Sequence, residues 1–597
     1  MQSKVLSLSF IVLLGSACQD TLLSTPPVSG ADGEQGANPG TGTPPCDPGA
    51  QSGDHRCPSD GGTPAPDGAS SEPVVRTIRI GPQVGAEPFN HQEEGSKRVI
   101  LDSNEHIVID RAGLSVNAQP IIWVANSREG TVSKINTRTM RQVARYCTYP
   151  GCNADPSRST VGIGGDVVVA NRAWREPFFS GSEASRASAV KIAGDRSRCV
   201  DRNGNGVIDT FEGEGPVPPA FQWTAGQASS PDECVIWLTR LHTDAAGNFI
   251  GGDGTLPRAA AFDAEIDADG NLSGRVYIGL HNTEEAIRLD AATGAILKRI
   301  NLQGTRPYGF VMDKFGNLWV RGSEGSLAKV EVRAGDRVTR YTGAKAPPCP
   351  YGITADSRGF IYTAGGGCVS RFNPQTEVWD TVSTGGSSGR GLAVDEKFNV
   401  WVADTYAGMY HIDASNPSSM VLRGRIPLVS GGGEYYVGAA IDLDGNPWVI
   451  NMERNTAYRI NPTGYAISPI ATGNRPYTYS DMTGAQLRIA GSASGIYRHT
   501  FSGCGPSTRW LSLDWGLTLP AGGSARIRLR SAASRAALQN ASWVDVAQVP
   551  PDVTRPVPIQ LAAGAAVEYL QVEVLLRSEN LETSPALTGL TVQLRCS

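Results

Sequence analysis

The stretch Tyr308-Gly-Phe-Val-Met-Asp-Lys-Phe-Gly-Asn-Leu-Trp-Val320 decides the fold, because it is typical of a strand, a tight turn and a second strand. It recurs at residues 351–363, 390–402 and 437–449. In each copy an Asp opens the turn and an aromatic residue lies in the second strand: Asp313, Asp356, Asp395 and Asp442, with Trp319, Tyr362, Trp401 and Trp448.

A second feature of the repeat is a basic residue about ten positions after the aromatic one, followed by an apolar residue. Seven units carry it: Lys134, Lys191, Arg288, Lys329, Arg371, His411 and Arg459. The three upstream partners in the aromatic column are Trp123, Val168 and Tyr277. The spacing from Val168 to Lys191 is longer than the others and indicates an insertion. We expect the basic heads to stay in water while their stems pack on the next unit.

The repeat period is roughly 40–50 residues of short strands, which is typical of propeller blades. One small sheet cannot bury both faces alone, whereas radial stacking buries them against neighbours. We therefore predict an all-β chain with a seven-bladed β-propeller over residues 76–501. Residues 76–120 are expected to enter the ring and to donate a strand that closes it. Trp237 lacks the following basic residue, so we do not count an eighth blade.

Residues 502–597 have a different pattern, in which apolar residues alternate with polar ones over several segments. Period-two patterning over about a hundred residues predicts a small C-terminal β-sandwich, jelly-roll-like in outline. Its Trp510, Trp515 and Trp543 are expected in the core, with stacking on a sugar as the alternative.

The first 18 residues are predicted to be an export signal, because Lys4 precedes a short apolar run. The run ends in small residues before Cys18, which favours lipoprotein processing with Cys18 as the lipidated residue; a plain secretory signal is the alternative. Gln19 after the cysteine favours a bacterial outer membrane and the cell surface. Residues 19–75 contain no Phe, Trp or Tyr and are predicted to be a disordered tether rich in Gly, Pro and Ser.

The chain has 597 residues, a net charge of −5 and no basic stripe, so nucleic-acid binding is not expected. No later segment is apolar enough to cross a membrane, which leaves the lipid anchor as the expected membrane contact. Of the 11 cysteines, ten remain after Cys18 and suit an exported protein. Sequence order predicts local pairs: Cys46–Cys57, Cys147–Cys152, Cys199–Cys234, Cys349–Cys368 and Cys504–Cys596.

Residues 201–212 match the twelve-residue calcium loop of EF-hand and dockerin-like modules. Calcium takes about seven oxygen ligands, and such loops supply them at alternate positions around a glycine turn. Gly206 is that glycine, and the predicted ligands are Asp201, Asn203, Asn205, Val207 through its carbonyl, Asp209 and Glu212. The alternative is a metal-free surface turn. The flanks are not EF-hand helices, so we predict an isolated structural calcium loop in an insertion near 199–234.

The blade repeats resemble virginiamycin B lyase-like propellers and, more loosely, NHL-type propellers, over roughly residues 121–472. That resemblance implies the propeller fold and raises the possibility of a metal-dependent lyase with its site on one face of the ring. The family's blades commonly read Trp-Phe-Thr-Glu, and the Glu is missing here: the fourth places hold Asn126, Asn171, Gly322, Gly365, Asp404 and Asn451. Four of these are polar and could hold a metal in the channel, as in lactone-hydrolysing propellers, but we expect them to cap turns.

Two functions remain open at this point. The first is a membrane-tethered, calcium-stabilised binding or scaffold protein whose propeller face docks an unknown protein or glycan. The second is a lyase or lactone hydrolase with its site at the propeller channel. No catalytic residues are identified, so whether the chain is an enzyme is uncertain, and we favour the first function.

Overall fold

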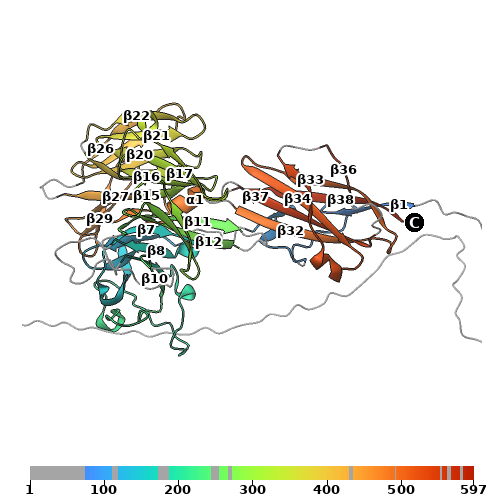
Figure 1. The fold of residues 1–597 in the computed structure, drawn as a ribbon, viewed down its shortest axis with the longest axis horizontal. Coiled ribbons are helices and arrows are strands. Elements are labelled where there is room, and N and C mark those ends of the chain that lie inside the picture. Colours follow the sequence, from blue (N-terminus) through green and yellow to red (C-terminus); the bar gives the residue numbers. More distant parts are fainter. Residues whose placement is uncertain are drawn as a thin grey trace, which may run out of the picture. The chain divides into compact units, whose positions relative to one another are not determined.

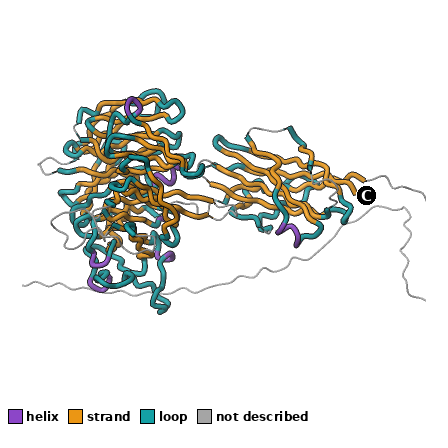
Figure 2. Tube along the Cα trace, viewed as in Figure 1, coloured by secondary structure: helices purple, strands orange, loops and turns teal. Residues whose placement is uncertain are grey.

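The structure, a computed structural model, describes residues 74–93, 95–110, 119–172, 187–243, 255–266, 272–386, 388–428, 434–490, 493–550, 554–560, 567–578 and 583–596. The predicted signal peptide, lipidation site and tether, with Cys46 and Cys57, lie outside these residues. Strands dominate the described residues and helices are short (Figures 1 and 2). The chain therefore has the all-β, propeller-like fold that the repeat predicts.

Between residues 121 and 480 the described strands form seven antiparallel sheets. The first and second sheets contain β4 (Ile121–Asn126), β5 (Thr131–Asn136) and β6 (Arg141–Cys147), then β7 (Pro156–Val161), β8 (Val167–Asn171), β9 (Ser188–Ile192) and β10 (Val235–Arg240). The third and fourth contain β11 (Pro257–Ile266), β12 (Leu272–Leu280), β13 (Glu285–Asp290) and β14 (Ile296–Asn301), then β15 (Pro307–Met312), β16 (Leu318–Gly322), β17 (Leu327–Glu331) and β18 (Arg337–Tyr341).

The remaining three sheets have four strands each. They are β19 (Gly352–Ala355), β20 (Ile361–Gly365), β21 (Cys368–Asn373) and β22 (Val378–Ser383); β23 (Gly389–Val394), β24 (Asn399–Asp404), β25 (Gly408–Asp413) and β26 (Val421–Ile426); and β27 (Tyr436–Ile441), β28 (Pro447–Asn451), β29 (Thr456–Ile460) and β30 (Ile467–Ala471). A short strand, β31 (Tyr479–Ser480), and the helix α1 (Ala485–Ala490) follow.

The two repeat columns face each other across the second and third strands of each sheet. Every aromatic-column residue is the register partner of its basic residue: Trp123 with Lys134, Val168 with Lys191, Tyr277 with Arg288, Trp319 with Lys329, Tyr362 with Arg371, Trp401 with His411 and Trp448 with Arg459. The aromatic-column side chains are all buried. The near-constant spacing in the sequence is therefore the length of a hairpin.

The sheets close into a ring through their first strands. β7 contacts β11, and contact continues through β15, β19, β23 and β27 to β31, which returns to β7. β31 pairs with β7 in parallel, and the Trp123 N–H of β4 donates to the carbonyl of Met482. The segment after β30 thus supplies the first strand that the β4 sheet lacks. We expected residues 76–120 to close the ring, and that expectation is wrong.

Several basic-column heads bind the neighbouring sheet instead of remaining in water. Lys134 Nζ donates to the Gly194 carbonyl at 2.8 Å, and Lys191 Nζ to that of Ala291 at 3.0 Å. At the junction of the last and first sheets, Arg459 Nη1 donates to the Thr137 carbonyl at 2.7 Å. The expected solvent exposure was wrong because these heads satisfy carbonyls that stacking removes from water.

Residues 74–110 belong to the C-terminal part of the chain and not to the ring. β1 (Val74–Ile80) pairs with β38 (Ala586–Cys596) along its whole length. The first sheet of this part also holds β2 (Val99–Leu101), β3 (Ile107–Ile109), β33 (Arg509–Thr518) and β36 (Val557–Pro558). The second holds β32 (Ala493–Ser502), β34 (Gly523–Ala532), β35 (Val544–Val549) and β37 (Tyr569–Ser578).

We call these two sheets, residues 74–110 and 493–596, the two-sheet domain. Its strands share one apolar core, to which Trp510 and Trp515 belong, as expected. Trp543 lies instead beside three arginines, Arg498, Arg528 and Arg530, with guanidinium carbons 5.4, 4.7 and 4.4 Å from its ring centroid. The predicted boundaries at 76 and 501 were misplaced because the ring is inserted between β3 and β32 in the sequence.

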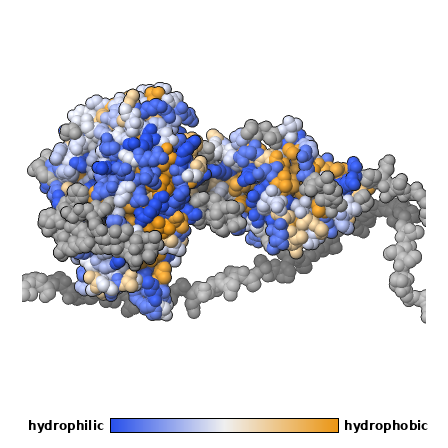
Figure 3. All heavy atoms as spheres, viewed as in Figure 1, coloured by the Kyte–Doolittle hydropathy of each residue, from blue (hydrophilic) through white to orange (hydrophobic). Residues whose placement is uncertain are grey.

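The described residues contain four of the five predicted disulfides: Cys147–Cys152, Cys199–Cys234, Cys349–Cys368 and Cys504–Cys596. No helix within the part of the chain that the structure describes is long and apolar enough to span a bilayer. On the visible face, hydrophilic residues cover much of the surface and apolar residues form smaller patches (Figure 3).

Candidate functional site

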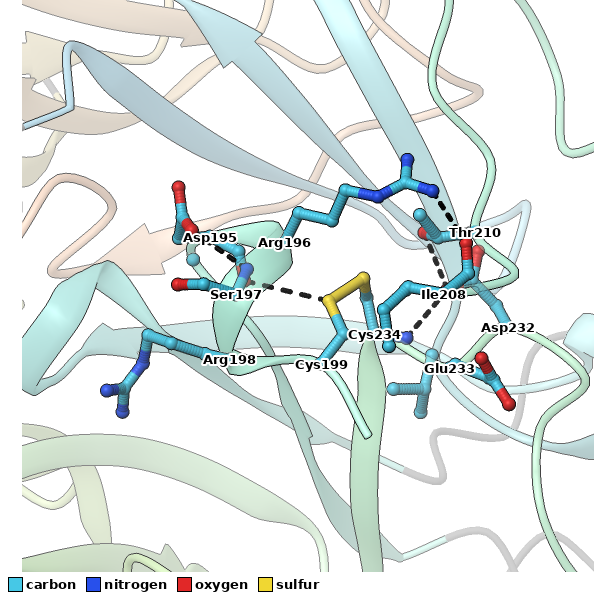
Figure 4. Close-up of a disulfide and its surroundings, with 12 residues drawn as sticks. Asp195, Arg196, Ser197, Arg198, Cys199, Ile208, Thr210, Asp232, Glu233 and Cys234 are labelled. Carbon is cyan, nitrogen blue, oxygen red and sulfur yellow. Dashed lines mark hydrogen bonds between the residues drawn. A yellow bond between two sulfur atoms is a disulfide. The ribbon is translucent and has the colours of Figure 1, made fainter. Parts of the chain in front are cut away.

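The insertion that carries the predicted calcium loop lies between β9 and β10, over residues 193–234. Cys199 and Cys234 bridge its two ends, as predicted (Figure 4). Asp232 lies inside it and accepts bonds from Thr210 Oγ1 at 2.9 Å and from the N–H of Phe211 at 3.0 Å. Burial raises the pKa of Asp232, against the lowering effect of these bonds. Trp237 lies on β10 opposite Lys191, which agrees with the rejection of an eighth blade.

Three of the predicted calcium ligands, Asn203, Asn205 and Asp209, contact one another, and Asp201 holds the backbone of the same loop. Asp201 Oδ1 and Oδ2 accept the N–H groups of Gly204 at 2.7 Å and Gly206 at 2.8 Å. The side-chain amides of Asn203 and Asn205 reach Asp209 Oδ2 at 2.7 and 3.2 Å. Gly206 has a φ of 81°, a conformation that glycine adopts without strain. The backbone therefore wraps as a calcium loop requires.

Glu212 does not join this group. Its Oε1 lies 3.1 Å from Arg196 Nη1, and both side chains are exposed. Glu233, which we did not single out, braces the loop instead: its carboxylate accepts the N–H groups of Arg202 at 2.7 Å and Asp209 at 2.8 Å. Those N–H groups lower the pKa of Glu233. Asp201, Asn203, Asn205 and Asp209 carry oxygen atoms of the kind that calcium prefers, and the carbonyl of Val207 lies in the same loop, so calcium binding here stays a prediction.

The four polar residues at the fourth place of the blade repeat mainly hold turns and neighbouring strands. Asn126 Oδ1 accepts the Gly473 N–H at 2.9 Å, and Asn171 Nδ2 donates to the Thr148 carbonyl at 3.0 Å. Asp404 Oδ2 accepts the Ser388 N–H at 3.0 Å. In the same way Asn451 Oδ1 accepts the Arg454 N–H at 3.2 Å. The described residues contain no group of three or more His, Cys, Asp or Glu side chains that could hold a metal.

A second candidate site lies where the first strands of the sheets meet. We call it the arginine–tyrosine cluster, and its members come from five of the seven sheets and the closing segment: Arg158, Arg172, Arg258, Tyr308, Tyr351, Arg390, Tyr477 and Tyr479. Five of these residues lie near the starts of β7, β11, β15, β19 and β23. The ring geometry brings these positions together, because equivalent residues of stacked sheets point to the same axis.

Hydroxyl groups form the centre of the cluster. Tyr308 Oη lies 2.9 Å from Tyr351 Oη, and Tyr477 Oη lies 3.2 Å from each of them. Two guanidinium groups donate to this centre: Arg258 Nη1 to Tyr308 Oη at 3.1 Å and Arg390 Nη1 to Tyr351 Oη at 2.8 Å. Three phenols from widely separated parts of the sequence therefore share one hydrogen-bonded triangle.

Arginines also lie against the ring faces. The guanidinium carbon of Arg158 is 4.3 Å from the ring centroid of Tyr479 and 5.8 Å from that of Tyr477. The guanidinium carbon of Arg172 also lies against Tyr477, 4.3 Å from its ring centroid. Such cation–π contacts gain strength where water is excluded, and Arg158 is 1% exposed.

The neighbouring charges shift the pKa values of the tyrosines in opposite directions. Burial would raise the pKa of Tyr477, but the guanidinium groups of Arg158, Arg172 and Arg258 outweigh it and lower that pKa to about 6. Burial and the neighbouring Tyr477 raise the pKa values of Tyr351 and Tyr479 well above 10. Of Tyr351, Tyr477 and Tyr479, Tyr477 is therefore the phenol whose surroundings favour ionisation.

Sequence reasoning missed this cluster, although a signal was present. A proline precedes the cluster residue in several repeats: Pro257-Arg258, Pro307-Tyr308, Pro350-Tyr351 and Pro476-Tyr477. The repeat motif is defined by its turn Asp and its aromatic residue, so it does not align the positions at the start of each first strand. Its residues alternate between Tyr and Arg, which hides the column from a search for one residue type.

No family model matches the chain, and no curated protein matches its sequence. Solved structures that resemble it include a catalytically inactive variant of virginiamycin B lyase from Staphylococcus aureus with quinupristin (13% identity, 54% of this chain and 86% of that chain, TM-score 0.35). A streptogramin B lyase structure shares 12% identity over 63% of this chain and 94% of its own, with a TM-score of 0.35. A protein from Lactobacillus plantarum shares 11% identity over 60% of this chain and 98% of its own, with a TM-score of 0.40.

Proposed function

We propose that this protein is an exported binding or scaffold protein that captures a ligand at the arginine–tyrosine cluster of a seven-bladed propeller. The supporting observation is the convergence of Tyr308, Tyr351 and Tyr477 on one point from separate sheets. The cluster combines aromatic rings with a few polar and charged groups, which is the usual composition of a ligand site. Tyr308, Tyr351 and Tyr477 are only partly buried, so they offer surface to an incoming molecule.

The rest of the proposal concerns how the protein is held. Cys18 would carry the lipid, residues 19–75 would act as the tether, and the cell surface of a bacterial outer membrane would be the location. The two-sheet domain would act as an accessory β-sandwich of jelly-roll type, and its facing sheets with one shared core support that reading. An unidentified protein or glycan would be the partner.

Calcium is proposed as the structural ion of the insertion. Asp201, Asn203, Asn205, Val207 and Asp209 would hold it, and Glu212 would complete the site after leaving Arg196. The contacts of Asn203 and Asn205 with Asp209 support this, since they bring three oxygen-bearing side chains together in one loop and calcium prefers oxygen ligands. Its role would be to stiffen a segment that otherwise depends on Cys199–Cys234 and Glu233.

The alternative function is a metal-dependent lyase or lactone hydrolase of the virginiamycin B lyase-like type. It would need a cluster of carboxylates and His at the channel, and the described residues hold no group of that kind. His281 lies beside the cluster, 6.3 Å from the Tyr308 ring, but its nitrogens contact Asn282 and Ser323. We therefore place the binding function first.

A capture experiment tests the binding proposal. The full chain, immobilised, is exposed to cell-envelope extract and to an array of glycans, beside a Tyr308→Ala, Tyr351→Ala double variant. We expect the variant to lose the captured molecule, because two of the three central phenols are gone. A matched control, Tyr465→Ala, removes an exposed tyrosine of the turn between β29 and β30, outside the cluster, and should retain capture. Equal capture by all three proteins would contradict the proposal.

A further inference from the structure

We propose that the arginine–tyrosine cluster binds an oxyanion, that is, a carboxylate, sulfate or phosphate group carried by the ligand. This inference rests on the proposed function, since it names the chemistry of the ligand that the same site would capture. It also specifies a linked event: the oxyanion replaces the negative charge of Tyr477, which then takes up a proton.

The charge balance of the cluster is the first argument. Several buried or half-buried arginines elsewhere in the described chain face carboxylates, for example Arg358 with Asp356 at 2.6 Å and Arg498 with Glu573 at 2.8 Å, whereas the buried Arg321 donates to the Ser326 carbonyl. Within the cluster Arg172 follows that pattern, with Asp155 at 2.6 Å. Among the described residues, neither Arg158 nor Arg390 has a carboxylate partner.

Burying a cation without an opposite charge costs free energy, so a negative charge bound at this site would stabilise the arginines. Arg158 is the clearest case, because its printed bonds run from Nε to the Arg258 carbonyl at 2.7 Å and from Nη1 to Ser157. Its remaining nitrogen, Nη2, donates to no atom in the described part of the chain. Guanidinium groups bind oxyanions through just such free N–H donors.

Arg390 has a different task. Its three nitrogens are used by Tyr351 Oη at 2.8 Å, Tyr435 Oη at 2.6 Å and Thr405 Oγ1 at 2.7 Å. It therefore supplies charge and fixes the direction of two phenol hydroxyls. Tyr435 packs against Tyr406, which is 67% exposed, with ring centroids 6.0 Å apart. These two rings form an aromatic rim beside the cationic centre.

The geometry around Tyr477 gives the second argument. Tyr308 Oη and Tyr351 Oη both lie within hydrogen-bonding distance of its oxygen, so each can donate to it when it is ionised. The groups that face Tyr477 come from every element packed around it: Arg158 on β7, Arg172 after β8, Arg258 on β11, Tyr308 on β15, Tyr351 before β19, Arg390 on β23 and Tyr479 on β31.

These facing groups are guanidinium groups and phenols, and Asp155, which lies beside them, is paired with Arg172. The phenolate of Tyr477 therefore acts as an internal counter-ion. A bound oxyanion would compete with it for the same guanidinium groups and would restore the usual preference of a buried phenol for its proton. Anion binding and proton uptake by one tyrosine thus form a linked pair.

The test uses the full chain and the near-ultraviolet absorbance of tyrosinate, followed from pH 5 to 9. Sodium sulfate is titrated at constant ionic strength against sodium chloride, and glucuronate is compared with glucose. We expect sulfate and glucuronate to raise the midpoint of the tyrosinate transition by about one pH unit, a tenfold gain in proton affinity. Glucose should not shift it. A response to glucuronate alone would identify an acidic sugar as the source, and a response to sulfate alone a free inorganic anion.

Variants separate the roles of the residues. Arg390→Gln should weaken sulfate or glucuronate binding at least tenfold by calorimetry, since it removes a charge and releases two hydroxyls. Tyr477→Phe should abolish the tyrosinate signal and the proton uptake, measured in two buffers, while anion binding persists. Arg423→Gln is the matched control, because Arg423 lies in the same sheet but pairs with Asp413 at its exposed outer strand.

Absence of any sulfate, phosphate or glucuronate binding to the wild-type chain would overturn the inference, as would equal binding by Arg390→Gln. These outcomes differ from failure of the proposed function. If a neutral ligand from the capture experiment binds and the Tyr308→Ala, Tyr351→Ala variant loses it, the site is a ligand site but the oxyanion is wrong. If that variant keeps its ligand while anions bind the cluster, the proposed function fails and the anion site remains.

Discussion

At the scale of single residues, the repeat is held by one carboxylate in each of four units. Asp395 Oδ1 accepts the N–H groups of Lys397 at 2.9 Å and Asn399 at 2.8 Å, and its Oδ2 accepts Trp401 Nε1 at 3.0 Å. Asp313 and Asp442 bind Trp319 and Trp448 in the same way, while Asp356 accepts the Tyr362 hydroxyl. The Asp thus ties the turn to the aromatic residue six positions later.

Asp395→Ala should therefore destabilise the protein by about 2–4 kcal/mol, because it leaves two turn N–H groups and a buried indole N–H without an acceptor. Urea denaturation followed by tryptophan fluorescence measures the loss. Glu396→Ala is the control, since that side chain is exposed in the same turn. Equal stability of the two variants would show that the carboxylate is not required.

Tyr477 makes a pH dependence expected. Its pKa is lowered to about 6 in the folded protein from an ordinary value of 10, so its contribution to stability is complete above pH 10 and is lost as the pH falls through 6. Between pH 6 and pH 10, the difference in free energy of unfolding between the wild type and Tyr477→Phe should therefore grow in favour of the wild type, by up to about 1.4 kcal/mol for each unit of rising pH. Denaturation curves at pH 6, 7, 8 and 9 measure this; a constant difference would contradict it.

At the scale of elements, the hairpins and the turn over residues 201–212 depend on residues close together in the chain, so fixed spacings in the sequence record them. Calcium binding by that turn stays a prediction. The partners of Glu212 and Glu233 could not be predicted, because Arg196 approaches from a separate 3₁₀ turn (Arg196–Arg198) and Glu233 from beyond the loop. The cluster was missed for the same reason, since its members meet only when the ring closes.

The Arg196–Glu212 contact leads to a prediction about calcium. Because Glu212 must leave Arg196 to bind the ion, Arg196→Gln should tighten calcium binding about two- to fivefold, the value of an exposed ion pair. Asp209→Ala should abolish the binding, so chelation should lower the melting temperature of the wild type but not that of Asp209→Ala. Melting curves across a calcium titration measure these effects. Arg141→Gln, which breaks an exposed pair with Glu214, is the control.

An unchanged wild-type melting temperature after chelation, together with no effect of Asp209→Ala, would leave the loop as a metal-free turn. That outcome would still be consistent with the hydrogen bonds of Glu233, which hold the loop backbone without an ion.

At the scale of the whole molecule, the propeller-like all-β fold could be predicted from the repeat, but the partners of its two ends could not. The unit pattern ends at Arg459, and nothing local in Tyr477 to Asp481 shows that this segment lies beside β4. The same limit applies to β1, whose partner β38 lies about 500 residues away in the chain. Strand pairings over such a long separation leave no regular spacing in the sequence. Residues 76–120 were therefore predicted to join the ring that follows them directly in the chain.

The two-sheet domain is built from two segments that are far apart in the sequence, and we expect the C-terminal segment to need the N-terminal one. Residues 74–110 contribute Ile80, Phe89, Val99, Ile107 and Ile109 to its core, and β1 covers one edge of β38. Each buried apolar side chain contributes about 1.5–3 kcal/mol, so their sum is comparable with the whole stability of a small domain. Residues 493–597 alone should therefore fail to unfold cooperatively.

Adding a peptide of residues 74–110 should restore cooperative unfolding, because it returns both the missing core residues and the strand that covers the β38 edge. Near-ultraviolet circular dichroism during urea titration measures this, and a peptide carrying Ile107→Asp is the control that should not rescue. Cooperative unfolding of 493–597 without the peptide would show that the C-terminal sheets are sufficient. In that case β1–β3 would add an edge to a finished domain, and the interruption of that domain by the ring would have no energetic consequence.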